Sequence, residues 1–433
     1  MKKLSFIVII LYSVFFTSCN EDEGTPSGGN DAVDLTGLPN QVILDWNLAV
    51  VEAMGGETYQ HSLLASRISA MTHIAMHDAL NAIAPLYKTY AFQGSDPEAD
   101  PIAATAVAAH AVLSASFPDQ QALLDAKLTA SLAGIEEGTG KTRGLALGKE
   151  AAAAILALRQ DDGAFQDPIA AVPVSDVPGV YQAVPPFDFV FAPHWRTMLP
   201  FALEKPEQFR IEPPVSLDSE VYAEDFNEVK TVGEINSATR TPDQTAYAKF
   251  WYEFSEMGWN RVTRVVAVEQ KLDLPKTARL FALVNMAMAD AYTAGWDSKF
   301  YYDFWRPYTA IRAAEADGNP YTTADADWEP AQPTPPVQDY PSTHSALGNA
   351  AATVLAYVLG NNTAFTLTSS TAPQGNAQRS FSSFSEAADE NADSRVMAGI
   401  HFRFSCTAGQ TLGTQIGQWV VENQLRPLEQ QVK

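Results

Sequence analysis

Three short polar segments of this 433-residue chain contain the side chains that could do chemistry together. The segments follow the patterns K-x6-R-P, P-S-x-H and S-R-x5-H, and they contribute Lys299, Arg306, Ser342, His344, Arg395 and His401. Three cations, a hydroxyl and two imidazoles suit a tetrahedral oxyanion, with one imidazole as ligand or nucleophile and the other as acid or base. The spacing therefore predicts one oxyanion site built from three separate segments.

The third segment must bring Arg395 and His401 to the same ligand. In a helix, six residues correspond to about 600° of rotation at ~100° per residue, so the two side chains would not share one stripe. We therefore expect Arg395 in the turn that leads into a helix and His401 inside that helix.

Most of the chain is predicted to be helical, because apolar residues recur at helical spacing over long stretches. The expected helices span Ser62–Ala84, Ile102–Ala115, Gln120–Leu132, Lys141–Leu158, Pro275–Ala294, His344–Leu359 and Thr407–Glu422. Strand signals are few and short, which predicts an all-α fold. Long proline-containing connections lie at 167–192, 206–221 and 317–341. The last of them leads into Ser342 and His344, so we expect it to form a wall or lid of the site.

Composition and the N-terminus indicate the compartment and the partners. A hydrophobic content of 46% allows a large core, and a formal charge of −23 would repel nucleic acid and anionic lipid. The start of the chain, with two lysines and an apolar run before Cys19, resembles a bacterial lipoprotein signal peptide, ordinary secretion being the alternative. We expect Cys19 to be lipidated and to anchor the protein in the outer membrane, on its periplasmic or cell-surface face. Residues 20–36 would then be a flexible tether and residues 37–433 one domain, without an intrachain disulfide, because Cys406 is the other cysteine.

The order and spacing of the three polar segments closely resemble the vanadium-dependent haloperoxidases and the type 2 phosphatidic acid phosphatase superfamily that shares their site. The resemblance implies an all-α fold of two four-helix-bundle-like halves with long proline-rich loops, and vanadate as cofactor. It implies that His401 binds the vanadium, that His344 is the acid–base group and that Lys299 polarises peroxide. The groups implied to hold the oxyanion are Lys299, Arg306, Ser342, the backbone N–H of Thr343, Arg395 and His401.

The implied reaction is the oxidation of iodide or bromide by hydrogen peroxide to hypohalous acid, which would then react with a small-molecule acceptor. The alternative is a metal-free acid phosphatase, in which His401 attacks phosphorus to form a phosphohistidine and His344 protonates the leaving group. A third interpretation is a non-catalytic surface lipoprotein that binds an oxyanion or a glycan through a decayed site. The oligomeric state is left open, a dimer included.

Two positions depart from the family pattern. Thr343 stands where P-S-G-H has glycine, and a β-branched residue would be strained there if φ is positive. Ser405 stands four residues after His401, where the phosphatases commonly have an aspartate that orients the imidazole. Ser405 or a backbone carbonyl could hold the ring less strongly, which favours a metal ligand over a nucleophile.

Other polar residues have weaker claims to function. His73 and His77 are four residues apart and could hold zinc on one helical face, but we expect two polar or semi-buried helix residues. Isolated residues expected to be structural are His61, His110 and His194, and those expected to line the core or a pocket are Phe250, Trp251, Tyr252 and Trp259. Asp290 could fix a site arginine, or serve as a cap or a surface residue.

An internal repeat is also suggested by the sequence. Residues 76–82 and residues 288–294 both begin with the pattern Met-x-Asp-Ala, and both lie in expected alanine-rich helices. Duplication of a helical bundle would leave such an internal similarity, and coincidence in alanine-rich sequence explains it equally well.

Overall fold

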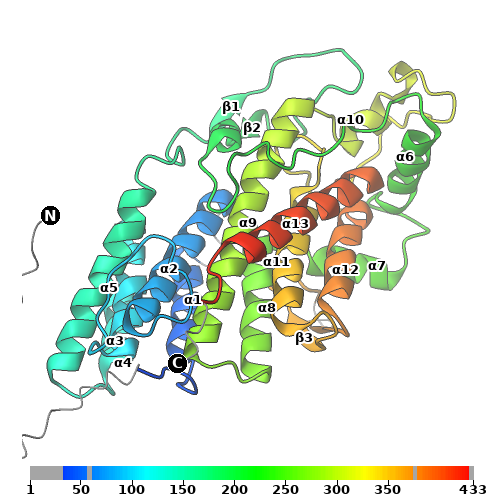
Figure 1. Ribbon diagram of the computed structural model, residues 1–433. Helices are drawn as coiled ribbons and strands as arrows, with labels where there is room; N and C mark the ends of the chain where they lie inside the picture. The colour runs from blue at the N-terminus through cyan, green and yellow to red at the C-terminus, as the bar shows by residue number, and fades with distance from the viewer. Residues whose placement is uncertain (1–32, 56–60, 374–377, 429–433) are drawn as a thin grey trace, which may run out of the picture. The chain divides into compact units, whose positions relative to one another are not determined.

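The computed structural model describes residues 33–55, 61–373 and 378–428, and it is predominantly helical (Figure 1). This confirms the predicted all-α class. The predicted signal peptide, Cys19 and most of the tether fall on residues 1–32, outside the described residues, and they stay predictions. Among the described helices, none combines the length and the apolar character that crossing a membrane requires.

The helices form two groups that meet along α9 (Figure 1). The first group contains α1 (Gln41–Ala53), α2 (Ser62–Ile83), α3 (Pro101–Ser116), α4 (Gln121–Leu132) and α5 (Thr139–Leu158). The second contains α8 (Ser255–Glu269), α9 (Leu274–Tyr302), α11 (Thr343–Leu359), α12 (Phe384–Met397) and α13 (Arg403–Asn423). Helix α9 packs on α2 in the first group and on α11 and α13 in the second.

Shorter elements lie between and beside these groups. They are the helices α6 (Glu220–Val232), α7 (Pro242–Phe250) and α10 (Pro307–Arg312), and two antiparallel strand pairs, β1 (Ile169–Ala171) with β2 (Phe189–Phe191) and β3 (Phe365–Thr368) with β4 (Gln378–Phe381). Side chains cap several helix starts, because a side-chain oxygen satisfies an amide that has no partner within the helix. Ser342 caps α11 in this way, and Ser383 caps α12.

Three glycines on α13 allow this helix to approach α11 closely. A Cβ atom at Gly409, Gly413 or Gly417 would lie 2.1 to 2.7 Å from a backbone carbonyl oxygen of α11 or of its capping residue. The spacing of four residues places all three glycines on one face of α13. The close approach holds the start of α13 beside the start of α11, which are the two ends that carry the predicted P-S-x-H and S-R-x5-H residues.

The seven helices expected from hydrophobic spacing are all present, and six other α-helices among the described residues were not predicted. Helix α12 was missed because its sequence is mostly polar. Helix α9 continues eight residues beyond the predicted end at Ala294, to Tyr302, and therefore places Lys299 in its last turn.

The suggested internal repeat has a structural counterpart in two buried aspartates. Asp78 on α2 accepts hydrogen bonds from the backbone N–H groups of residues 90–92, at 2.7 to 2.9 Å. Asp290 on α9 accepts three in the same way from residues 201–203, at 2.6 to 2.9 Å. The proposal that Asp290 fixes a site arginine is therefore wrong, because its carboxylate holds a backbone segment instead.

Candidate active site

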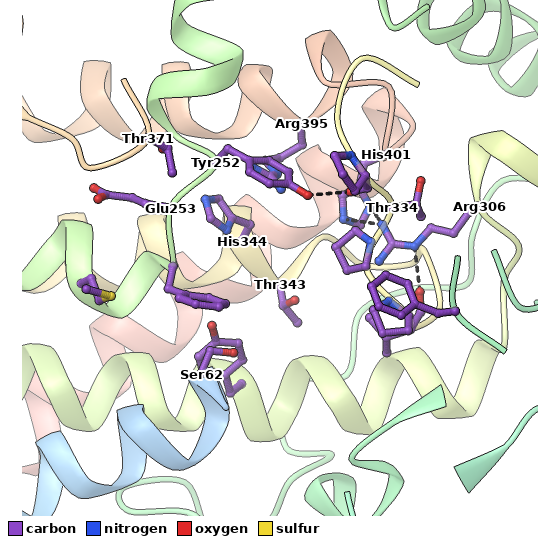
Figure 2. A pocket seen from close by; sticks show the side chains of 18 of the residues that line it. Ser62, Tyr252, Glu253, Arg306, Thr334, Thr343, His344, Thr371, Arg395 and His401 are labelled. Atoms are coloured by element: carbon purple, nitrogen blue, oxygen red, sulfur yellow. Dashed lines mark hydrogen bonds between the residues drawn. The ribbon is translucent and has the colours of Figure 1, made fainter. Parts of the chain in front are cut away.

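A cavity of about 460 Å³ brings most of the predicted site residues together (Figure 2). Its lining includes Arg306, Thr343, His344, Arg395 and His401, which come from all three polar segments. Residues 333–337 form one side of the cavity, which confirms that the proline-rich connection is a wall of the site. Arg306 fixes this wall by donating from Nε to the carbonyl of Val337 at 2.7 Å.

The turn between α12 and α13 positions His401. Arg395 lies in the last turn of α12, and His401 lies after that helix and before α13 begins at Arg403. The expected arrangement, with Arg395 before a helix and His401 within it, is therefore wrong. Gly399 explains the difference, because its φ of +78° ends α12 in the left-handed conformation that glycine adopts readily.

Gly399→Ala is expected to disrupt this turn. A Cβ at this position would lie 2.3 Å from the carbonyl oxygen of Gly233 and 3.0 Å from Cα of Pro330. The left-handed conformation alone costs a non-glycine residue about 1–2 kcal/mol, and the clash adds to it. We expect a lower free energy of unfolding in urea, together with loss of oxyanion binding.

Gly360→Ala is the matched control for this prediction. Gly360 also has a positive φ, +87°, but a Cβ there would meet nothing within 4 Å. It should show the conformational cost alone and bind the oxyanion normally. Equal effects of the two substitutions would contradict the role given to the Gly399 contact.

His401 is buried and is contacted through both ring nitrogens. Nε2 lies 2.9 Å from Nη1 of Arg306, and Nδ1 lies 2.8 Å from Oδ1 of Asp339. Burial, with Arg306 as the next cause, lowers the pKa of His401 well below its usual range. A neutral ring with its proton on Nδ1 satisfies both neighbours, because Nε2 then accepts from the guanidinium. The lone pair of the imidazole is therefore on Nε2, where it accepts from Arg306 and becomes available to another atom once that guanidinium turns away.

Two arginines and a helix end supply positive potential to the cavity. Nη1 of Arg395 donates to the carbonyl of Trp251 at 3.0 Å, while its Nε has no hydrogen-bond partner among the described residues. Burial lowers the pKa of Arg395 to about 10, so the group stays charged at neutral pH. The first turn of α11 also lines the cavity, and helix N-termini favour anions. A buried N–H group without a partner, such as Nε of Arg395, is a suitable hydrogen-bond donor to an oxyanion.

Lys299 and Ser342 lie behind the cavity lining. Nζ of Lys299 donates to the backbone carbonyls of Gln338 and Asp339, at 2.5 and 2.9 Å. Burial, followed by the neighbouring Arg306, lowers the pKa of Lys299 well below its usual range. Ser342 accepts hydrogen bonds from the amide and hydroxyl of Ser345. In this structure both residues support the segment that carries the site, and their contact with an oxyanion stays a prediction.

Thr343 occupies its position without the backbone strain that a positive φ would cause. It is the first residue of α11, and its φ is not among the positive values of the described chain. Its methyl group faces Gly295 of α9, where a Cβ would come within 2.2 Å of Cγ2. The absence of a side chain on α9 thus provides the space that a threonine needs here.

Both ring nitrogens of His344 are bonded to the segment that joins α7 and α8. Nε2 lies 2.7 Å from the carbonyl oxygen of Trp251, and Nδ1 lies 2.8 Å from Oγ of Ser255. The carbonyl can only accept, so Nε2 carries the proton and Nδ1 accepts from the serine. Burial and then Arg395 lower the pKa of His344 well below its usual range, which keeps the ring neutral.

Residues 251–255 are a part of the site of which sequence reasoning recognised only Trp251 and Tyr252, as core or pocket lining. Besides binding His344 and Arg395, this segment donates from Tyr252 to the carbonyl of Pro333 at 2.8 Å and so reaches the opposite wall. The guanidinium of Arg395 also lies 5.5 Å from the centre of the Tyr252 ring. The aromatic cluster could be seen in the sequence, but nothing in the sequence indicated that the Trp251 carbonyl would accept hydrogen bonds from the site.

Asp339 was missed altogether. It is fully buried, immediately before Tyr340, and it contacts His401 through one oxygen and the hydroxyl of Ser405 through the other. Burial raises the pKa of Asp339 to about 6, while Arg306 and Lys299 favour its charged form. Its position three residues before Ser342 was the available signal.

The remaining histidines have separate protein partners. His73 is 2.8 Å from the Asn47 amide nitrogen and stacks on Phe281, whereas His77 bonds the carbonyl of Lys88. Within the part of the chain that the structure describes, no group of three or more His, Cys, Asp or Glu residues could hold a metal ion. His110 pairs with Asp125 at 2.8 Å, near the surface. His61 caps α2, and the ring of His194 packs on Trp195.

Comparisons with known proteins agree with the fold. A family model described as the VCPO second helical-bundle domain matches residues 279–430. Vanadium chloroperoxidase from Curvularia inaequalis is 29% identical over 296 residues, which cover 52% of this chain and 48% of that protein. The match therefore spans about half the length of that relative.

Solved structures extend the likeness over most of the chain. The structure titled as the first bacterial vanadium-dependent iodoperoxidase has a TM-score of 0.78 and 27% identity, covering 92% of this chain and 98% of that one. A holo-type bacterial vanadium-dependent chloroperoxidase has a TM-score of 0.69 at 18% identity, covering 90% and 98%. The second likeness concerns the fold alone.

Proposed function

Because this chain belongs to the vanadium haloperoxidase family, we propose that it binds vanadate and uses hydrogen peroxide to oxidise a halide to hypohalous acid. The observation that carries the proposal is the buried His401 on the cavity wall, whose Nε2 lies 2.9 Å from Nη1 of Arg306 and whose burial favours the neutral form. A neutral imidazole is the form that binds a metal. Iodide and bromide are the expected halides, because they are easier to oxidise than chloride.

The residues present fit vanadate, which resembles phosphate in shape and charge. His401 would be its protein ligand, and Arg306 and Arg395 would neutralise its oxygens from the guanidinium groups that line the cavity. The N-terminal turn of α11 would add backbone donors, including the N–H of Thr343. When bound, vanadate supplies the Lewis acid that activates hydrogen peroxide.

The chain's own contribution is to position groups and to handle protons. Halide oxidation consumes one proton, since H₂O₂ + X⁻ + H⁺ gives HOX + H₂O. His344 holds a proton on Nε2 and is the acid–base group in our proposal. The neutral ring can take up a proton only through the lone pair on Nδ1, which accepts from the Ser255 hydroxyl, so that bond must open first. Aromatic and proline side chains on the cavity wall, including Phe187, Phe254 and Pro335, limit the access of water.

The proposal is tested with the purified protein, residues 37–433, assayed for iodide and bromide oxidation by hydrogen peroxide with and without added vanadate. We expect oxidation that depends on vanadate. Phosphomonoester hydrolysis is measured in parallel, because the same cations would also bind phosphate. Phosphate release that vanadate suppresses, without halide oxidation, would overturn the proposal and favour the acid phosphatase.

A further inference from the structure

A buried carboxylate lies directly behind the imidazole of His401. Oδ1 of Asp339 is 2.8 Å from Nδ1 of His401, and Oδ2 accepts a hydrogen bond from the hydroxyl of Ser405. The Asp339 side chain is inaccessible to solvent. Within the described chain Oδ1 has no well-aligned hydrogen-bond donor, so the N–H of the imidazole is the group placed to satisfy it. Such bonds are often poorly aligned in ligand-free sites and tighten in complexes.

We propose that Asp339 is the positioning residue for His401 and that Ser405 holds the Asp339 carboxylate in place. The carboxylate keeps the imidazole proton on Nδ1, and the lone pair on Nε2 is thereby directed to the oxyanion. This inference deepens the proposed function and rests on it for the identity of the ligand. The orienting group therefore comes from the loop before α11, and the start of α13 supplies the hydroxyl that supports it.

The distances separate this role from that of a simple counter-ion. The same oxygen of Asp339 is 3.8 Å from Nη1 of Arg306, a full ångström farther than from His401. Lys299 binds the backbone carbonyl of Asp339 rather than its carboxylate. Arg306 also has its own acceptors, the carbonyls of Val337 and Ile400, both at 2.7 Å. The imidazole is thus the nearest partner of Oδ1.

The contact between the two side chains suggests an exchange experiment. Because the Ser405 hydroxyl touches the Asp339 carboxylate, the two side chains meet at one point behind the imidazole. The backbone around position 405 is fixed there as well, since the N–H of Ser342 donates to the Ser405 carbonyl at 2.9 Å. A carboxylate on residue 405 with a hydroxyl on residue 339 would occupy the same space with the roles reversed.

The first test uses Asp339→Asn, which keeps the shape but offers the imidazole an amide instead of a carboxylate. We expect vanadate affinity to fall by roughly 10–100-fold, the usual effect of removing such a partner. In the vanadate-free protein, ¹⁵N NMR of labelled histidine should show a smaller share of His401 rings with the proton on Nδ1, because Arg306 alone then opposes a proton on Nε2. Asp303→Asn is the matched control, because Asp303 accepts from the Gln338 side chain and is not a partner of His401.

The second test is rescue by exchange. Asp339→Ser alone should lose affinity, and Asp339→Ser combined with Ser405→Asp should recover most of it and restore the Nδ1 proton. Unchanged tautomer and affinity in Asp339→Asn would overturn the inference, as would a folded double variant no better than Asp339→Ser. Failure of the proposed function can be told apart from failure of this inference. If the wild-type protein had no vanadate-dependent activity, Asp339→Asn would still change the His401 tautomer relative to wild type in the vanadate-free state.

Discussion

Replacing His401 by alanine is expected to abolish vanadate-dependent halide oxidation while the protein stays folded. The substitution removes the imidazole whose Nε2 carries the lone pair, whereas Arg306 and Arg395 still attract the anion. We expect the loss of vanadate affinity to exceed the roughly 10–100-fold that outer partners contribute. Equilibrium titration with vanadate and peroxidase assays at saturating vanadate measure the two effects separately.

His344→Ala is the comparison for that experiment. His344 lines the same cavity but is bonded to Ser255 and Trp251 rather than facing Arg306. We expect this variant to keep vanadate binding and to lose most of its turnover, because it lacks the acid–base group. Full activity in both variants would refute the site.

Asp290→Ala is expected to cause the largest loss of stability among single substitutions away from the site. It leaves three backbone N–H groups of residues 201–203 without their acceptor in a buried position. Each unsatisfied buried group costs roughly 1–3 kcal/mol, so a loss on the order of 3–9 kcal/mol in the free energy of unfolding is expected. Against a typical total of 5–15 kcal/mol this is severe. Urea unfolding followed by circular dichroism measures it.

Two further variants serve as comparisons for that result. Asp78→Ala removes the equivalent acceptor of residues 90–92 and should cost a similar amount. Asp161→Ala changes an exposed aspartate and should alter stability by less than about 0.5 kcal/mol. If Asp290→Ala unfolded at the same urea concentration as Asp161→Ala, the two backbone-binding aspartates would not be the structural equivalents that the internal repeat suggests.

The sequence predicted the part of the site that the spacing of the three motifs alone specifies. Arg306, His344, Arg395 and His401 do line one cavity, and hydrophobic periodicity located α9, α11 and α13, although it missed α12, which carries Arg395. It failed where one residue redirects the backbone. The glycine at 399 reverses the order of helix and turn around His401, and a pattern of polar residues does not reveal a helix end of this kind.

Tertiary contacts explain what else the sequence could not show. Asp339 reaches His401 only because the loop before α11 and the start of α13 meet in the folded chain. The lack of an aspartate at position 405 had favoured a metal ligand over a nucleophile. That argument no longer holds, since Asp339 provides a carboxylate at the same imidazole. The preference for vanadate chemistry now rests on the likeness to vanadium haloperoxidases and on the burial that favours a neutral His401.

The backbone carbonyl of Trp251 has a consequence for how the site responds to pH. This one oxygen accepts from both Nη1 of Arg395 and Nε2 of His344. Two donors that share an acceptor compete, so an anion that draws the guanidinium away strengthens the remaining bond to the imidazole. By thermodynamic reciprocity, the proton affinity of His344 and the anion affinity of Arg395 change by the same factor. A titration of anion binding against pH therefore reports on two residues at once, coupled through a peptide group that no side-chain substitution removes.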